Sequence, residues 1–95
     1  MPRPNAPARI DRLHRALALA EAGLVEAAVR GPAAATLALD ALRDLGAVLD
    51  TSSSTNRLRF CGALGTCTSD VGTGLLRSWA NAARREIGKM KGASR

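Results

Sequence analysis

The segment FCGALGTCTSDVGTG, residues 60–74, contains both cysteines of the chain, four of its glycines and a Ser-Asp pair. A structural zinc site needs about four cysteine or histidine ligands, usually in close pairs. Cys61 and Cys67 are six positions apart, and the only histidine, His14, is distant in the sequence. We therefore expect no metal and no cofactor.

The two thiols have other possible roles. A disulfide between Cys61 and Cys67 is sterically possible across a loop that contains glycine, but an intracellular protein normally keeps its thiols reduced. A nucleophilic thiol would need a base or an arginine nearby, and the position six residues after Cys67 is Thr73. We predict no catalytic residue and no enzymatic activity, with both cysteines packing as small apolar side chains.

The glycines of this segment resemble those of a phosphate-binding loop, because TSDVGTG leads into a helix whose backbone N–H groups would face an anion. The segment lacks the Gly-Lys-Ser/Thr of a P-loop, however, and Asp70 would place a negative charge where the anion binds. We interpret the segment as a connector that ends at an N-cap, Ser69 or Asp70, and presents the helix that follows.

Basic residues are concentrated at the two ends of the chain. The formal net charge is +6. Residues 1–15 carry four arginines and one Asp, residues 16–56 carry two arginines and five acidic residues, and residues 57–95 carry eight basic and two acidic residues. Basic terminal segments attract polyanions, chiefly nucleic acid or an anionic membrane surface. Solubility alone is an equally simple explanation for this distribution.

Two helices are predicted in the first half of the chain. The first spans residues 8–30 and ends at Gly31-Pro32, and the second spans residues 33–49. So short a break predicts a helical hairpin. Its Leu/Ala surfaces, in a chain with almost no aromatic residues, favour a homo-oligomer. The hairpin residues predicted to carry this assembly are Leu17, Leu24, Leu42, Leu45 and Leu49.

The remaining chain is predicted to contain one extended segment and one helix. RLRF, residues 57–60, is an extended arm or a short strand that would need another chain to form a sheet. The last helix, residues 69–91, presents Leu76, Trp79 and Ile87 on its apolar side. The expected fold is a single small all-α domain. It comprises a flexible N-terminus (1–7), a helical hairpin (8–49), a loop and arm (50–68), a C-terminal amphipathic basic helix (69–91) and a tail (92–95).

The basic last helix and the arm are the candidate binding elements. Arginines and one amide on such a helix can contact phosphates and a groove of the duplex. The predicted nucleic-acid-binding residues are Arg57, Arg59, Arg77, Asn81, Arg84, Arg85, Lys89 and Lys91.

The sequence favours two functions and does not separate them. The first is a non-enzymatic nucleic-acid-binding accessory protein, with DNA favoured over RNA, acting as a packaging or regulatory factor of a bacterium or mobile element. The alternative is a modulator or inhibitor that binds a nucleic-acid-processing protein. No segment approaches the ~18 apolar residues of a membrane span, and the polar start lacks a signal-peptide core. We therefore expect a cytoplasmic protein with no membrane partner.

Overall fold

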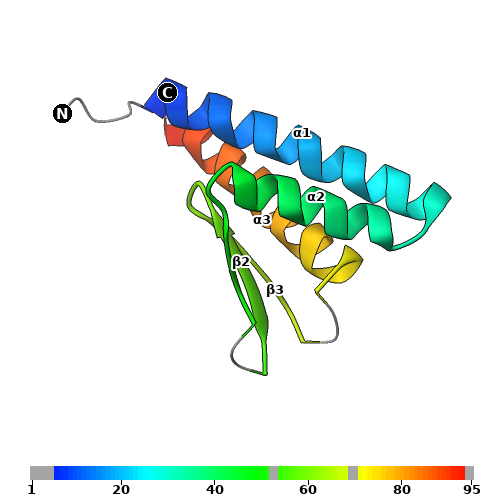
Figure 1. Cartoon of the computed structure of the whole chain (residues 1–95). Helices are drawn as coiled ribbons and strands as arrows, with labels where there is room; N and C mark the ends of the chain where they lie inside the picture. Colours follow the sequence, from blue (N-terminus) through cyan, green and yellow to red (C-terminus); the bar gives the residue numbers. More distant parts are fainter. Residues whose placement is uncertain (1–5, 52–53, 69–70, 94–95) are drawn as a thin grey trace.

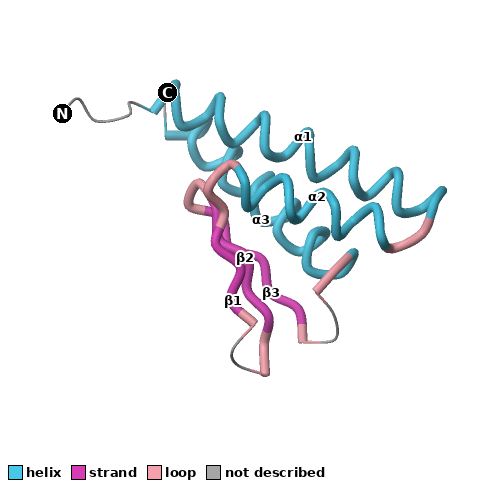
Figure 2. Tube along the Cα trace, viewed as in Figure 1, coloured by secondary structure: helices cyan, strands magenta, loops and turns pink. Residues whose placement is uncertain are grey.

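The computed structural model describes residues 6–51, 54–68 and 71–93, and its fold is α+β. Three helices lie on one side of a three-stranded antiparallel sheet (Figure 1 and Figure 2). The N-cap predicted at Ser69 or Asp70 lies outside the described residues, as do the chain ends at 1–5 and 94–95. The elements are α1 (Ala6–Arg30), α2 (Ala33–Asp44), β1 (Val48–Asp50), β2 (Asn56–Phe60), β3 (Ala63–Cys67) and α3 (Thr73–Ala93).

The prediction for the end of the first helix and the turn after it is confirmed. The helix begins at Ala6 and not at residue 8, so residues 6–7 do not belong to a flexible N-terminus. Helix α1 ends at Arg30, directly before Gly31-Pro32. Its side chains on the predicted apolar stripe are buried at Leu13 and Leu17. The two helices approach closely where Gly23 faces Ala38, because any side chain on Gly23 would overlap the Ala38 methyl group.

The prediction for the second helix is wrong at its C-terminal end, because α2 stops at Asp44 and does not continue to Leu49. Gly46 has a φ of 116°. Its N–H donates to the carbonyl of Arg43 at 3.0 Å, and the next N–H donates to the carbonyl of Leu42 at 3.0 Å. This pair of bonds around a left-handed glycine is the Schellman motif, which terminates helices. Leu49 therefore belongs to strand β1.

The all-α prediction is wrong because the predicted arm is the central strand of a sheet. Strand β2 pairs antiparallel with β1 on one side and with β3 on the other. Its partners therefore come from its own chain, and it needs no second copy to form a sheet. Strand β3 occupies the ALGTC segment, which the sequence analysis interpreted as part of a connector.

A two-residue turn joins β2 to β3. Phe60 pairs with Ala63, which leaves Cys61 and Gly62 as the turn. Their φ angles are 52° and 81°. Two successive positive φ values are typical of a type I′ hairpin turn, whose twist matches that of the strands it connects. Because the turn fixes the register, it also fixes which side chains of the strands face the helices.

Helix α3 packs across the inner face of the sheet. It also contacts α1 and α2, so one continuous core joins the sheet to the helical hairpin. Its backbone at Trp79 rests on Gly65 of β3, where a Cβ would lie only 2.5 Å from Trp79 Cα. Trp79 is fully buried, and its Nε1 has no hydrogen-bond partner within the described structure. Leu76 and Ile87 are buried on the same helix, as the sequence predicted. On its other side, α3 packs against α1.

The predicted bounds of the last helix, 69–91, are wrong, because α3 spans Thr73–Ala93 and residues 71–72 are not helical. Glycine at position 72 disfavours an earlier start of the helix.

Candidate nucleic-acid interface

The two cysteines are separated by the length of strand β3. Cys61 lies in the β2–β3 turn and Cys67 is the last residue of the strand. A strand rises about 3.3 Å per residue, so the thiols lie far beyond the ~7 Å limit between the Cα atoms of a disulfide. Both thiols are half-buried and pack against the core. Within residues 6–51, 54–68 and 71–93, no three or more His, Cys, Asp or Glu side chains form a possible metal site.

Two predicted binding residues, Arg57 and Arg59, project from the outer face of the sheet. Exposure alternates along β2, so Leu58 and Phe60 are buried while both arginines are exposed. Helix α3 covers the opposite, inner face of the sheet. The two arginines of β2 therefore do not share a surface with the predicted binding residues of α3.

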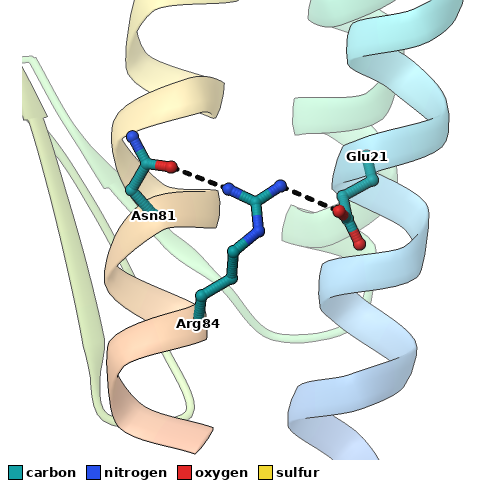
Figure 3. A network of polar contacts seen from close by, with 3 residues as sticks. All are labelled: Glu21, Asn81 and Arg84. Atoms are coloured by element: carbon teal, nitrogen blue, oxygen red, sulfur yellow. Dashed lines mark hydrogen bonds and ion pairs between the residues drawn. The ribbon is translucent and has the colours of Figure 1, made fainter. Parts of the chain in front are cut away.

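Arg84 of α3 is held by contacts within the chain. Its Nη2 donates to Glu21 Oε2 of α1 at 2.8 Å, and its Nη1 donates to Asn81 Oδ1 at 2.7 Å (Figure 3). The Arg84 and Glu21 side chains are 47% and 48% exposed, so water and salt weaken this ion pair. Arg84, which was predicted to bind nucleic acid, thus connects α3 to α1, and Asn81, also predicted to bind nucleic acid, accepts a hydrogen bond from the same guanidinium.

The other predicted residues of α3 differ in what surrounds their charges. Arg77 and Arg85 are exposed. No acidic group of the described residues lies within 4.0 Å of either guanidinium. Lys89 lies 3.6 Å from Glu86, one turn away on the same helix. The side chain of Lys91 lies outside the described part of the chain.

Three arginines of α1, absent from the predicted site, lie close to the β2–β3 turn. The guanidinium of Arg9 lies against Gly62 of that turn. The guanidinium carbon of Arg12 is 5.8 Å from the centre of the Phe60 ring, which is cation–π distance. Arg12 and Arg15 also line a depression of about 190 Å³ beside that ring. The sequence signal was the spacing of three between successive arginines, which places them near one another on a helix.

The start of α1 and the end of α3 lie at the same end of the molecule (Figure 1). Two acidic groups of the helical hairpin are paired with other cations, since Glu26 contacts Arg30 and Asp40 contacts Arg43. Asp11 is the acidic residue nearest in sequence to the arginines at the start of α1, and it forms no ion pair with them. No ion pair in the described structure involves an arginine from the start of α1. We use the name basic end for the exposed basic residues in the first half of α1 and the second half of α3, namely Arg9, Arg12, Arg15, Arg85 and Lys89.

Most of the leucines that were predicted to mediate self-association lie in the hydrophobic core of the protomer or pack against it. Leu17 and Leu42 are only 8% and 0% exposed, so they are not available to a second copy. Leu24 and Leu49 are half-buried against the same core, and Leu45 is 51% exposed. The hairpin does leave other large apolar side chains exposed, namely Val25, Val29 and Leu37.

Comparison of the chain with protein-family models, with curated proteins and with solved structures gives no match. None of the helices in the described ranges combines the length and apolar character that crossing a membrane requires. Functional inference therefore depends on the residues themselves.

Proposed function

We propose that this protein is a non-enzymatic accessory factor that binds nucleic acid through the basic end. The supporting observation is that Arg9, Arg12, Arg15 and Arg85 have no acidic partner among the described residues. An exposed guanidinium that no carboxylate neutralises attracts phosphate and can donate two parallel hydrogen bonds to it. Several such groups at one end of a small protein favour a polyanion over a single small anion.

The aromatic residues favour a double-stranded ligand. Proteins that bind single strands stack bases on exposed aromatic rings. Phe60 and Trp79 are the only aromatic residues of the chain, and they are 7% and 0% exposed. The available contacts are therefore to phosphates, and DNA duplex is the first ligand to test.

This proposal keeps only part of the site predicted from the sequence. Arg85 and Lys89 stay in the site, while Arg84 serves the contact between helices. Arg57 and Arg59 face away from α3 and do not belong to the basic end. A packaging or regulatory role in the cytoplasm of a bacterium, or in a mobile element, is part of the proposal, and its support is the positive charge and small size of the chain.

The test is binding of a fluorescent DNA duplex across a salt series, with two double variants of equal net charge. Arg9→Ala with Arg15→Ala should weaken binding to unrelated duplexes alike and lower the salt slope by about two units. The control is Arg30→Ala with Arg43→Ala, because both of these arginines are ion-paired within the hairpin. We expect the control to retain nearly all of the parent affinity. Equal losses in the two variants would indicate attraction by net charge alone.

Absence of duplex binding by the parent protein at low salt would contradict the proposed function. Loss of binding in the Arg9 and Arg15 variant counts only if its far-UV circular dichroism and its unfolding midpoint match those of the parent. Arg12 is left unchanged in this test because its contact with the Phe60 ring gives it a structural role.

Self-association through the hairpin also remains a proposal, supported by the exposed apolar residues there. Sedimentation should give a mass above that of one chain. Leu37 is 69% exposed, so Leu37→Asp should lower the mass without unfolding the chain. Leu42→Asp is unsuitable, because it would bury a charge inside the protomer whether or not a second copy binds.

A further inference from the structure

The outer face of the sheet has no cover from the described residues. All three helices lie on the other side (Figure 2). The strand register aligns Val48, Arg59 and Leu64 in one row across the three strands. Val48 is 63% exposed and Leu64 is 43% exposed. A guanidinium therefore lies between two exposed aliphatic side chains.

A second row on the same face contains Asp50, Arg57 and Thr66. A shallow hollow of about 100 Å³ spans the two rows. Neither Arg57 nor Arg59 has an acidic group of the described chain within 4.0 Å. The face thus combines aliphatic surface with two guanidinium groups that form no ion pair with the described residues, and it also contains one carboxylate, that of Asp50 opposite Arg57.

This combination fits a protein-binding surface, because arginine is enriched in protein interfaces and the buried centre of an interface is more apolar than the rest of the protein surface. A phosphate backbone would use the two arginines but would gain nothing from Val48 and Leu64. A second copy is also disfavoured. Two copies related by a two-fold axis that passes through β2 would bring the arginines of one outer face against those of the other.

The edges of the sheet are poor sites for a partner that binds as an added strand. Strand β1 is an edge strand, but it is only three residues long. At the other edge, the Thr66 N–H of β3 donates to Ser78 Oγ of α3 at 3.0 Å. A helix laid across the outer face would instead contact all three strands and complete a helix–sheet–helix sandwich.

We propose that the outer face of the sheet binds an acidic amphipathic helix of another protein. The carboxylates of that helix face Arg57 and Arg59, and its apolar side chains cover Val48 and Leu64. Complementary charge sets the orientation of the helix, and burial of the aliphatic side chains supplies affinity. This site is distinct from the basic end and does not depend on nucleic-acid binding.

The test is an NMR titration of the ¹⁵N-labelled protein with a synthetic helical peptide that has leucines at helical spacing flanked by glutamates. We expect chemical-shift changes of backbone amides in β1, β2 and β3, and no changes in the helical hairpin formed by α1 and α2. Two control peptides are matched to the first. One replaces each glutamate with lysine, and the other replaces each leucine with serine. Both should bind at least about tenfold more weakly.

Protein variants locate the site. Arg59→Glu should lower the affinity for the acidic peptide by about tenfold or more, because it places a carboxylate opposite carboxylates. Leu64→Ser should lower it several-fold. The matched controls are Arg77→Glu, an equal charge change on α3, and Leu37→Ser on the hairpin; both should bind like the parent. Trp79 fluorescence during urea unfolding verifies that each variant is folded.

Several results would overturn the proposal. The first is the absence of chemical-shift changes with millimolar peptide. The second is a set of changes confined to the helical hairpin of α1 and α2. The third is equal binding by the peptide that lacks leucines. Concentration-dependent shifts of the strand amides without peptide would assign the face to a second copy. A last result would assign the outer face to nucleic acid. In that case the double variant Arg57→Ala with Arg59→Ala loses duplex binding, while Leu64→Ser has no effect on peptide binding.

Discussion

The two faces of the sheet are built from the same three strands but from different kinds of residue. Along β2, Leu58 and Phe60 face the helices while Arg57 and Arg59 face solvent. On β3, Gly65 is buried against Trp79 while its neighbour Leu64 stays exposed. Side chains on the inner face must fit the space left by the helices, whereas side chains on the outer face have no such limit on their size. Substitutions on the inner face should therefore change stability, and substitutions on the outer face should change binding.

The largest effect is expected where the inner face has no free space. Gly65→Val should lower the free energy of unfolding by at least ~3 kcal/mol, because its side chain would overlap the α3 backbone. Thr66→Val, on the adjacent exposed position, should change it by less than ~0.5 kcal/mol. Urea unfolding followed by Trp79 fluorescence measures both. Similar losses in the two variants would show that the faces are assigned incorrectly.

The same chemical change on each face provides the next comparison. Leu58 is fully buried and Leu64 is 43% exposed. Leu58→Ala should cost about 3 kcal/mol through lost burial and the cavity left behind. Leu64→Ala should cost less than ~1 kcal/mol, since exposed positions contribute little. Thermal unfolding of the two variants tests the contrast, and a costly Leu64→Ala would mean that the outer face is buried against something in solution.

A smaller effect is expected at the turn that determines which residues face inward. Gly62 has a φ of 81° and lies against Arg9, so Gly62→Ala should cost about 1–2 kcal/mol. The control is Gly88 of α3, which has open space where a Cβ would be. Gly88→Ala should stabilise the protein by up to ~1 kcal/mol, because alanine favours the helix. Chemical denaturation should therefore show changes of opposite sign, and changes of equal sign would contradict the turn geometry.

The smallest effect concerns exposed arginines outside the sheet. A double-mutant cycle of Arg84→Ala and Glu21→Ala should give a coupling of less than ~1 kcal/mol that salt reduces, since both side chains are about half exposed. Arg77→Ala, which removes an arginine without an ion pair on the same helix, should leave stability unchanged. A coupling that persists at high salt would mean that the pair is less accessible to solvent than its exposure indicates.

The sequence identified the helices better than the strands for a physical reason. The stripe of α1 repeats over many turns, so its period is clear from Ile10 to Ala27. Strand β1 has three residues, and its Leu49 continues the apolar spacing of α2. Gly46 marks the end of the helix in the structure. In the sequence, this single glycine lies inside an apolar pattern that continues at helical spacing to Leu49, and the pattern therefore predicted a longer helix. Strand β3 contains Gly65, which strand propensities disfavour and which only the packing of Trp79 explains.

The candidate site was predictable in its chemistry but not in its geometry. The sequence indicated correctly that basic residues are concentrated at the chain ends. Whether an arginine is already paired depends on tertiary contacts, and the contact of Arg84 with Glu21 spans 63 positions. For the same reason, the proximity of Arg9 to the β2–β3 turn could not be read from the chain. RLRF alternates basic and apolar residues, and in the structure Arg57 and Arg59 are exposed while Leu58 and Phe60 are buried.

The packing of α3 between the sheet and α1 has a consequence for how the chain folds. The helical hairpin and the two strand pairings each join neighbouring segments, so they require only short loops to close. The contact between α1 and α3 joins distant segments and carries a larger loop-closure entropy. We expect docking of α3 to be the late, rate-limiting step. Helix α3 supplies core residues both to the helical hairpin (α1 and α2) and to the sheet (β1, β2 and β3). We therefore expect neither of these two parts to persist as a stable folding intermediate before α3 docks.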